Sequence, residues 1–163
     1  MKIITVLGKS GIGKSSAIRY ALIELLSKGV FEVIYNSKKY DNNSAQLAKK
    51  LDLDFYTKKG YVGQITIVGI INRKRVCITT YGDSYKYDIK PAIDKGVELL
   101  KDLDLFVCAS HDSGYNSLKS MVNENCFEES KKEKSILTKN EWDDENREFG
   151  KQLVKMIIKS TRE

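Results

Sequence analysis

Residues 2–29 read KIITVLGKSGIGKSSAIRYALIELLSKG, and this stretch decides the fold. Its first six residues, Lys2 to Leu7, are mostly apolar and β-branched and end at a glycine, which predicts a buried strand of a parallel sheet. From Ala17 onward, apolar residues recur at helical spacing up to Gly29, where a glycine would end the helix. Between the two lies the octet GKSGIGKS at residues 8–15. The stretch therefore predicts a strand, a glycine-rich loop and a helix in direct succession.

The octet has the spacing of a loop that holds phosphate, with glycines at Gly8 and Gly13 followed by Lys14 and Ser15. Glycine allows the backbone to curl with positive φ, so that successive amide groups point inward and can donate to phosphate oxygens. The positive end of the following helix adds to that field. We expect Lys14 to lie across the β and γ phosphates of a nucleoside triphosphate, and the Ser15 hydroxyl to bind Mg²⁺. The residues expected to hold the nucleotide are Gly8, Lys9, Ser10, Gly11, Ile12, Gly13, Lys14, Ser15 and Ser16.

Over Gly8 to Ser16 the chain resembles the Walker A segment of the P-loop NTPase superfamily, and the order of the remaining elements is compatible with the α/β sandwich of that family. The resemblance implies Mg-ATP or Mg-GTP as the ligand, and it does not choose between kinases, GTPases and motor-type ATPases. The guanine-reading pattern of GTPases, Asn-Lys-x-Asp, has only a poor counterpart in TKNE at residues 138–141. We therefore expect ATP rather than GTP.

Length, charge and cysteine usage narrow the class of protein. A chain of 163 residues is long enough for one domain with a single core. No apolar run is long enough to span a membrane and the N-terminus lacks a signal-peptide pattern, so we expect a cytoplasmic protein with no membrane partner. The net charge of +6 suits an anionic ligand, although the lysines are dispersed and a nucleic-acid partner stays open. We expect the three widely spaced cysteines to be reduced, with at least two of them buried.

Beyond residue 29, alternating strand-like and helix-like patterns predict one α/β domain over residues 1–163. The runs at 64–71 and 75–80 are so close that we expect a hairpin, with one strand antiparallel to the rest of the sheet. The expected fold is a three-layer α/β/α sandwich with a mainly parallel sheet of about five or six strands, strand 3–7 being central. The other expected elements are strands at 30–35, 103–109 and 135–138, helices at 44–51, from Pro91 onward, at 117–122 and at 142–160, and a charged connector at 128–134.

A phosphate-bound metal also needs an acid at the end of a neighbouring strand. Asp83 follows the apolar run that ends in Thr79 and Thr80, and Asp112 follows the next such run. We choose Asp83, because in proteins of the resembled family the strand before this acid commonly lies beside the loop-bearing strand. The alternative is that Asp83 only completes a Gly-Asp-Ser turn.

Further candidates lie near these acids. His111 and Asp112 fall where the carboxyl edge of the sheet is expected, and they could orient a water or an acceptor hydroxyl. Arg73 and Arg75, at the hairpin, could be transition-state arginines or simply an exposed basic tip.

The expected function is that of a small kinase-like phosphotransferase or ATPase that binds Mg-ATP. Its acceptor would be a nucleoside, a nucleotide or another small anionic or hydroxyl compound, and residues 123–134 could form a lid over it. The alternative is an ATP-dependent switch that binds a nucleic-acid or protein partner.

Overall fold

The computed structural model describes residues 1–8, 13–57, 64–131 and 139–163. Its strands are β1 (Lys2–Leu7), β2 (Glu32–Asn36), β3 (Thr66–Ile71), β4 (Lys74–Thr79), β5 (Leu105–Ser110) and β6 (Phe127–Lys131). Its helices are α1 (Lys14–Ser27), α2 (Ser44–Thr57), α3 (Lys90–Leu100), α4 (Asp112–Ser120) and α5 (Lys139–Arg162), together with short helical turns at Tyr85–Ile89 and Glu124–Cys126. Among these helices, none is both long and apolar enough to cross a bilayer.

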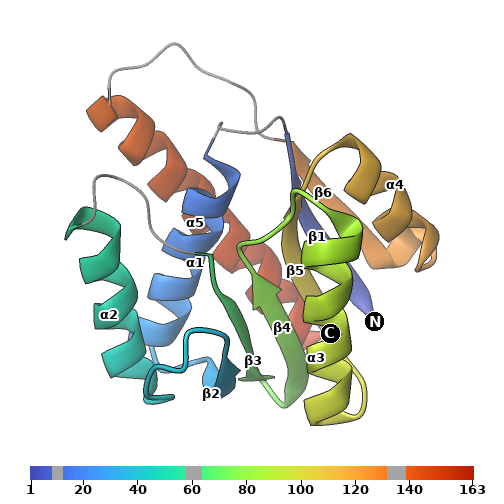
Figure 1. Cartoon of the computed structure of the whole chain (residues 1–163), viewed down its shortest axis with the longest axis horizontal. Helices are drawn as coiled ribbons and strands as arrows, with labels where there is room; N and C mark the ends of the chain where they lie inside the picture. Colours follow the sequence, from blue (N-terminus) through green and yellow to red (C-terminus); the bar gives the residue numbers. More distant parts are fainter. Residues whose placement is uncertain (9–12, 58–63, 132–138) are drawn as a thin grey trace.

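All six described strands form one sheet in the order β2-β3-β4-β5-β1-β6 (Figure 1). β1 runs parallel to both β5 and β6, and β4 runs parallel to β5, whereas β3 is antiparallel to β2 and to β4. The expected hairpin is therefore confirmed, with its antiparallel strand second from one edge. β1 is an interior strand as expected, although it lies next to the edge strand β6 rather than at the middle.

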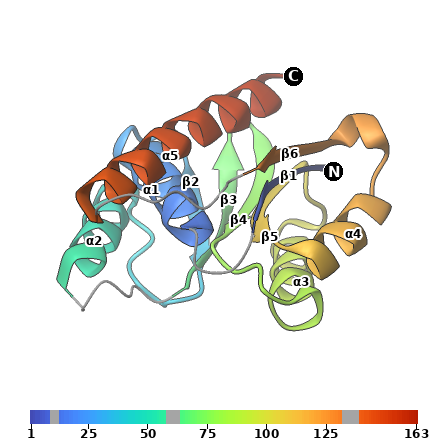
Figure 2. The same ribbon diagram turned by 90° about the horizontal axis from the view of Figure 1, so that it is seen from above.

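Helices cover both faces of the sheet. Because successive strand residues point to opposite faces, Ile4 and Val6 of β1 join a core with α1, α2 and α5, while Ile3 joins a second core with α3 and α4. Figure 2 shows these two helical layers with the sheet between them. The chain is thus an α/β protein with a mixed sheet between two layers of helices.

The helix after the glycine-rich loop ends as the sequence indicated. Gly29 has φ +68°, and its amide donates to Leu26 O at 3.1 Å, while the amide of Val30 donates to Leu25 O at 3.2 Å. This pair of bonds is the Schellman arrangement, in which a left-handed residue just past the helix satisfies its last carbonyl groups. The direct succession of β1 and α1 is confirmed.

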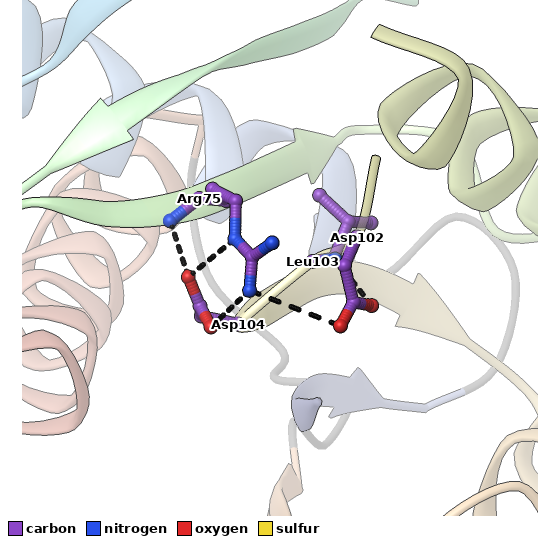
Figure 3. Close-up of polar contacts among 4 residues, drawn as sticks. All are labelled: Arg75, Asp102, Leu103 and Asp104. Atoms are coloured by element: carbon purple, nitrogen blue, oxygen red, sulfur yellow. Dashed lines mark hydrogen bonds and ion pairs between the residues drawn. The ribbon is translucent and has the colours of Figure 1, made fainter. Parts of the chain in front are cut away.

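The hairpin turn lies far from the glycine-rich loop. Asn72 and Arg73 both have positive φ, which makes the two-residue connection of β3 and β4 a type I′ turn. Arg75 follows on β4 and is held by Asp104, whose carboxylate oxygens accept from Nε and Nη2 at 2.9 Å and from the Arg75 amide at 2.8 Å (Figure 3). The guanidinium lowers the pKa of Asp104 to about 2, mainly through these hydrogen bonds. The arginine thereby fastens the start of β4 to the start of β5.

Two expectations in the last third of the chain need correction. The segment expected as a charged connector, 128–134, includes most of β6, which pairs with β1 from Phe127 to Lys131. An edge strand is held by its main-chain hydrogen bonds, so its polar side chains gave no apolar pattern to recognise. Because residues 127–131 are paired in the sheet, this part of the segment expected as a lid, 123–134, is not a lid, and residues 132–134 lie outside the described residues. The strand expected at 135–138 lies outside the described residues.

Candidate functional site

Three strand ends and one helix start meet at the carboxyl edge of the sheet. β1 ends before Gly8, β5 ends at Ser110 and β4 ends before Thr80. The amide of Gly8 donates to Ser110 O at 3.2 Å, which continues the pairing of β1 and β5 by one residue. α1 begins close by with Lys14, so the first turn of the helix points its free amides at this edge.

Lys14 is buried at this junction with 5% of its surface exposed. Its Nζ donates to Gly8 O at 2.5 Å and to Ser110 O at 3.2 Å. These two carbonyl oxygens hold the ammonium group at the junction of β1, β5 and α1. An ammonium group beside the start of a helix is a feature typical of anion-binding sites.

Ser15 links the start of α1 to the end of β4. Its Oγ donates to Thr80 O at 3.0 Å and accepts from Gln64 Nε2 at 3.4 Å. Because the hydroxyl donates its proton to the Thr80 carbonyl and accepts one hydrogen bond, a second lone pair of its oxygen is available for a cation. Among the described residues, no group of three or more His, Cys, Asp or Glu side chains is close enough to bind a metal. A magnesium ion bound through one hydroxyl, phosphate and water does not need such a group.

Gly13 connects the loop to α1 in a conformation that favours glycine. Its φ is +94°, and a Cβ at this position would lie 2.5 Å from Oδ1 and 2.6 Å from Nδ2 of Asn146 on α5. Asn146 is fully buried, and neither of these two atoms has a hydrogen-bond partner among the described residues. Burying a side-chain amide without partners costs about 1–3 kcal/mol. The position of Asn146 against Gly13 therefore needs an explanation, such as a polar contact with the loop or its ligand.

The sequence contained a signal for Asn146 that we missed. The apolar stripe of α5 runs through Phe149, Leu153 and Ile157, and Asn146 occupies the position one turn earlier on the same stripe. A polar residue where the period requires an apolar one indicates a buried polar group.

Asp83 and His111 come together at the same edge. His111 Nε2 lies 3.9 Å from Asp83 Oδ1, and the Asp83 side chain is 73% exposed. The two approach because Gly82 packs so closely on β5 that a Cβ there would overlap the carbonyl oxygen of Ala109. Asp112 is the first residue of α4, and its side chain lies outside the described part of the structure.

The reason given for choosing Asp83 was wrong, because β5 lies between β4 and the loop-bearing strand β1. The end of β4 nevertheless reaches the loop region through the contact of Thr80 with Ser15. Asp83 follows Thr80 by three residues. It therefore remains the candidate metal-binding acid because of the contact between Thr80 and Ser15.

Arg73 and Arg75 do not belong to this site. Both lie at the amino end of β4, which runs parallel to β1 through β5, so they lie at the opposite edge of the sheet from Gly8. The length of β1, at about 3.3 Å per residue, separates the two edges by roughly 17 Å. This separation exceeds the reach of a guanidinium, and Arg75 is engaged by Asp104. The interpretation of these residues as transition-state arginines was wrong.

The glycine-rich loop itself is described only in part. Lys9, Ser10, Gly11 and Ile12 lie outside the described residues, whereas Gly8, Gly13, Lys14, Ser15 and Ser16 lie within them. The structure thus brings Lys14, Ser15, Asp83 and His111 to one edge of the sheet.

Comparisons with protein-family models, with curated proteins and with solved structures gave no significant match for this chain. The function must therefore be argued from the chemistry of the site.

Proposed function

We propose that the chain is a P-loop NTPase that binds Mg-ATP and acts as a small phosphotransferase on a nucleoside, a nucleotide or a similar acceptor. The observation that carries the proposal is Lys14, an ammonium group buried between the carbonyl ends of β1 and β5 at the start of α1. The helix start and the positive φ of Gly13 support it. They are the features that a phosphate-binding loop requires.

Each side chain has a role that follows from its surroundings. Lys14 has three donor protons and can turn one of them from a carbonyl oxygen to a phosphate oxygen. Ser15 keeps its proton on Thr80 O and offers its oxygen to the metal. A Mg²⁺ ion held by Ser15 would supply positive charge against the negative charge that builds on the transferring phosphate. Asp83 would accept hydrogen bonds from the water shell of the metal, and His111 lies beside this carboxylate, with Nε2 3.9 Å from Oδ1.

Nucleotide binding is tested by thermal unfolding with and without Mg-ATP. At about 100 times its Kd, a ligand stabilises the folded state by roughly 2.7 kcal/mol. Lys14→Ala should remove most of this gain. Lys28→Ala, at the other end of α1 where the lysine pairs with Glu24 at the surface, is the matched control and should keep it. Because Lys14 is buried, circular dichroism must show that the variant is folded. An unchanged ATP-induced shift in folded Lys14→Ala would refute the loop as the binding site.

Catalysis is tested separately at Asp83. Asp83→Asn keeps the shape but removes the charge, so nucleotide affinity should fall modestly while turnover falls about a hundredfold, equivalent to roughly 2.7 kcal/mol in the barrier. Asp112→Asn is the comparison. If Asp112→Asn loses turnover and Asp83→Asn keeps it, the metal role belongs to Asp112.

The reaction type is tested with labelled ATP and a panel of nucleosides, nucleotides and 5′-hydroxyl oligonucleotides. Phosphoryl transfer forms a bond from the acceptor oxygen to the γ-phosphorus and breaks the bond from that phosphorus to the bridging oxygen, with ADP leaving. A phosphotransferase transfers label only when an acceptor is present. Slow phosphate release with every compound would instead indicate an ATPase or an ATP-dependent switch.

A further inference from the structure

A second cleft, distinct from the Lys14 junction, opens at the same edge of the sheet. It has a volume of about 250 Å³ and lies between the carboxyl ends of β2 and β4 and the start of α3. This volume is somewhat below the range of about 300 Å³ and more that accommodates drug-sized ligands, so the cleft suits a smaller molecule. Its lining includes Tyr35, Tyr81, Tyr87, Asp88, Pro91 and Lys95.

The cleft adjoins the proposed catalytic centre through one residue. Thr80 presents its carbonyl oxygen to Ser15 on the side of α1, and Tyr81, the next residue, lines the cleft on the side of α3. Neighbouring Cα atoms are about 3.8 Å apart. The cleft therefore begins one residue from Thr80, which binds the proposed metal ligand Ser15. The cleft and the contact of Ser15 with Thr80 thus lie on either side of the end of β4, one residue apart along the chain.

Three tyrosines give the cleft flat aromatic walls. The side chain of Tyr87 is 72% exposed at the rim, so a ligand that stacks on it removes apolar surface from water. Lys95 Nζ lies 5.0 Å from the ring centroid of Tyr35, which places a hydrogen-bond donor against one wall. Aromatic walls bind nucleobases of any sequence, since every base has a π-face.

The cleft also has a fixed acceptor for hydrogen bonds. Asp88 Oδ2 accepts from the Ser84 amide at 2.9 Å, and the Ser84 hydroxyl accepts from the Tyr87 amide at 3.2 Å. These two bonds hold the turn before α3, so the Asp88 carboxylate and the main chain of Tyr87 keep their relative positions. A carboxylate and an ammonium group in one cleft match the donor and acceptor groups on the edge of a nucleobase.

We propose that this cleft binds the base of a nucleoside or nucleoside monophosphate, the phosphoryl acceptor of the reaction. The role of the bound nucleoside as phosphoryl acceptor rests on the proposed function. Binding of a nucleoside to the cleft can be measured independently of that function. The base stacks on Tyr87 and bonds with Asp88 and Lys95. The acceptor oxygen then points past Tyr81 toward the phosphate.

The test is isothermal titration calorimetry of the full chain with adenosine, guanosine, cytidine, uridine and thymidine, first alone and then with saturating non-hydrolysable ATP. At least one nucleoside should bind under both conditions, since the two ligands occupy different sites. Tyr87→Ala should weaken that binding at least tenfold, whereas Tyr87→Phe, which keeps the ring, should stay within about twofold of the wild type. Lys95→Ala should weaken it, and Lys155→Ala, an exposed lysine of α5, should not.

Lys14→Ala separates the two proposals, because it should lose ATP-induced stabilisation and keep nucleoside binding. If no nucleoside binds the wild type while ATP still stabilises it, the cleft proposal is overturned and the proposed function stands. Nucleoside binding that is equal in Tyr87→Ala and the wild type, or that non-hydrolysable ATP displaces, also overturns it. Nucleoside binding that depends on Tyr87, without any ATP-induced stabilisation, supports the cleft and refutes the proposed function.

Discussion

Adding one methyl group at Gly13 should destabilise the protein through two separable effects. The first is backbone strain, because φ +94° is unfavourable for alanine and left-handed conformations cost about 1–2 kcal/mol. The second is overlap, because the new Cβ would lie 2.5–2.9 Å from three side-chain atoms of Asn146. Overpacking a closed site costs about 1–3 kcal/mol. Gly13→Ala should therefore lower the free energy of unfolding by roughly 2–5 kcal/mol.

The two effects can be measured apart by a double-mutant cycle with Asn146→Ala. This variant removes the overlapping atoms but leaves the backbone strain, so Gly13→Ala should cost only about 1–2 kcal/mol in its presence. Asn146→Ala alone should have a small effect, because it removes two buried polar atoms that have no partner among the described residues, and this gain offsets the cavity left behind. Urea unfolding without nucleotide, followed by circular dichroism, gives all four free energies.

Gly29 provides the matched control. It also has positive φ, at +68°, but a Cβ there would meet no described atom within 4 Å. Gly29→Ala should therefore cost the strain alone, about 1–2 kcal/mol, with or without Asn146. Equal costs for Gly13→Ala in the two backgrounds would refute the contact between the loop and α5.

Two further measurements test the framework around the site. Because the pKa of Asp104 is lowered to about 2, its contribution to stability is complete above pH about 4 and is lost as the pH falls toward 2. Asp104→Asn should therefore cost about 1 kcal/mol at pH 7, allowing for the partial exposure of its pair with Arg75, and should flatten the acid unfolding curve over that range. Burial raises the pKa of Cys108 to about 12 and raises that of Cys77, so a maleimide at pH 8 should modify Cys126 in the native protein and all three thiols in urea. Rapid modification of a second thiol in the native protein, seen by mass spectrometry, would contradict this burial.

Local patterns made part of the fold predictable. The apolar run before Gly8 and the helical period after Lys14 define β1 and α1, because each element buries its own apolar side chains. The hairpin was predictable from its short connection. Two thiols, Cys77 and Cys108, were expected to be buried because they lie inside apolar runs, and this is confirmed.

The errors came from contacts between residues distant in sequence. Nothing in the run before Asp83 reveals that β5 separates β4 from β1, because strand order depends on contacts across the whole chain. The misplacement of Arg75 was avoidable. The hairpin precedes β4, so if β4 runs parallel to β1, its arginines must lie at the edge opposite the loop.

The pairing of β1 has a consequence for how the protein is made. Leu7 pairs with Ser110, so β1 leaves the ribosome about 100 residues before its partner strand β5. At synthesis rates of about 5–20 residues per second, this delay is roughly 5–20 s. During that time β2, β3 and β4 can pair with one another, since their connections are local. The Lys14 junction, which needs Ser110, cannot yet exist. A nascent chain that ends before β5 should therefore not be retained on immobilised ATP.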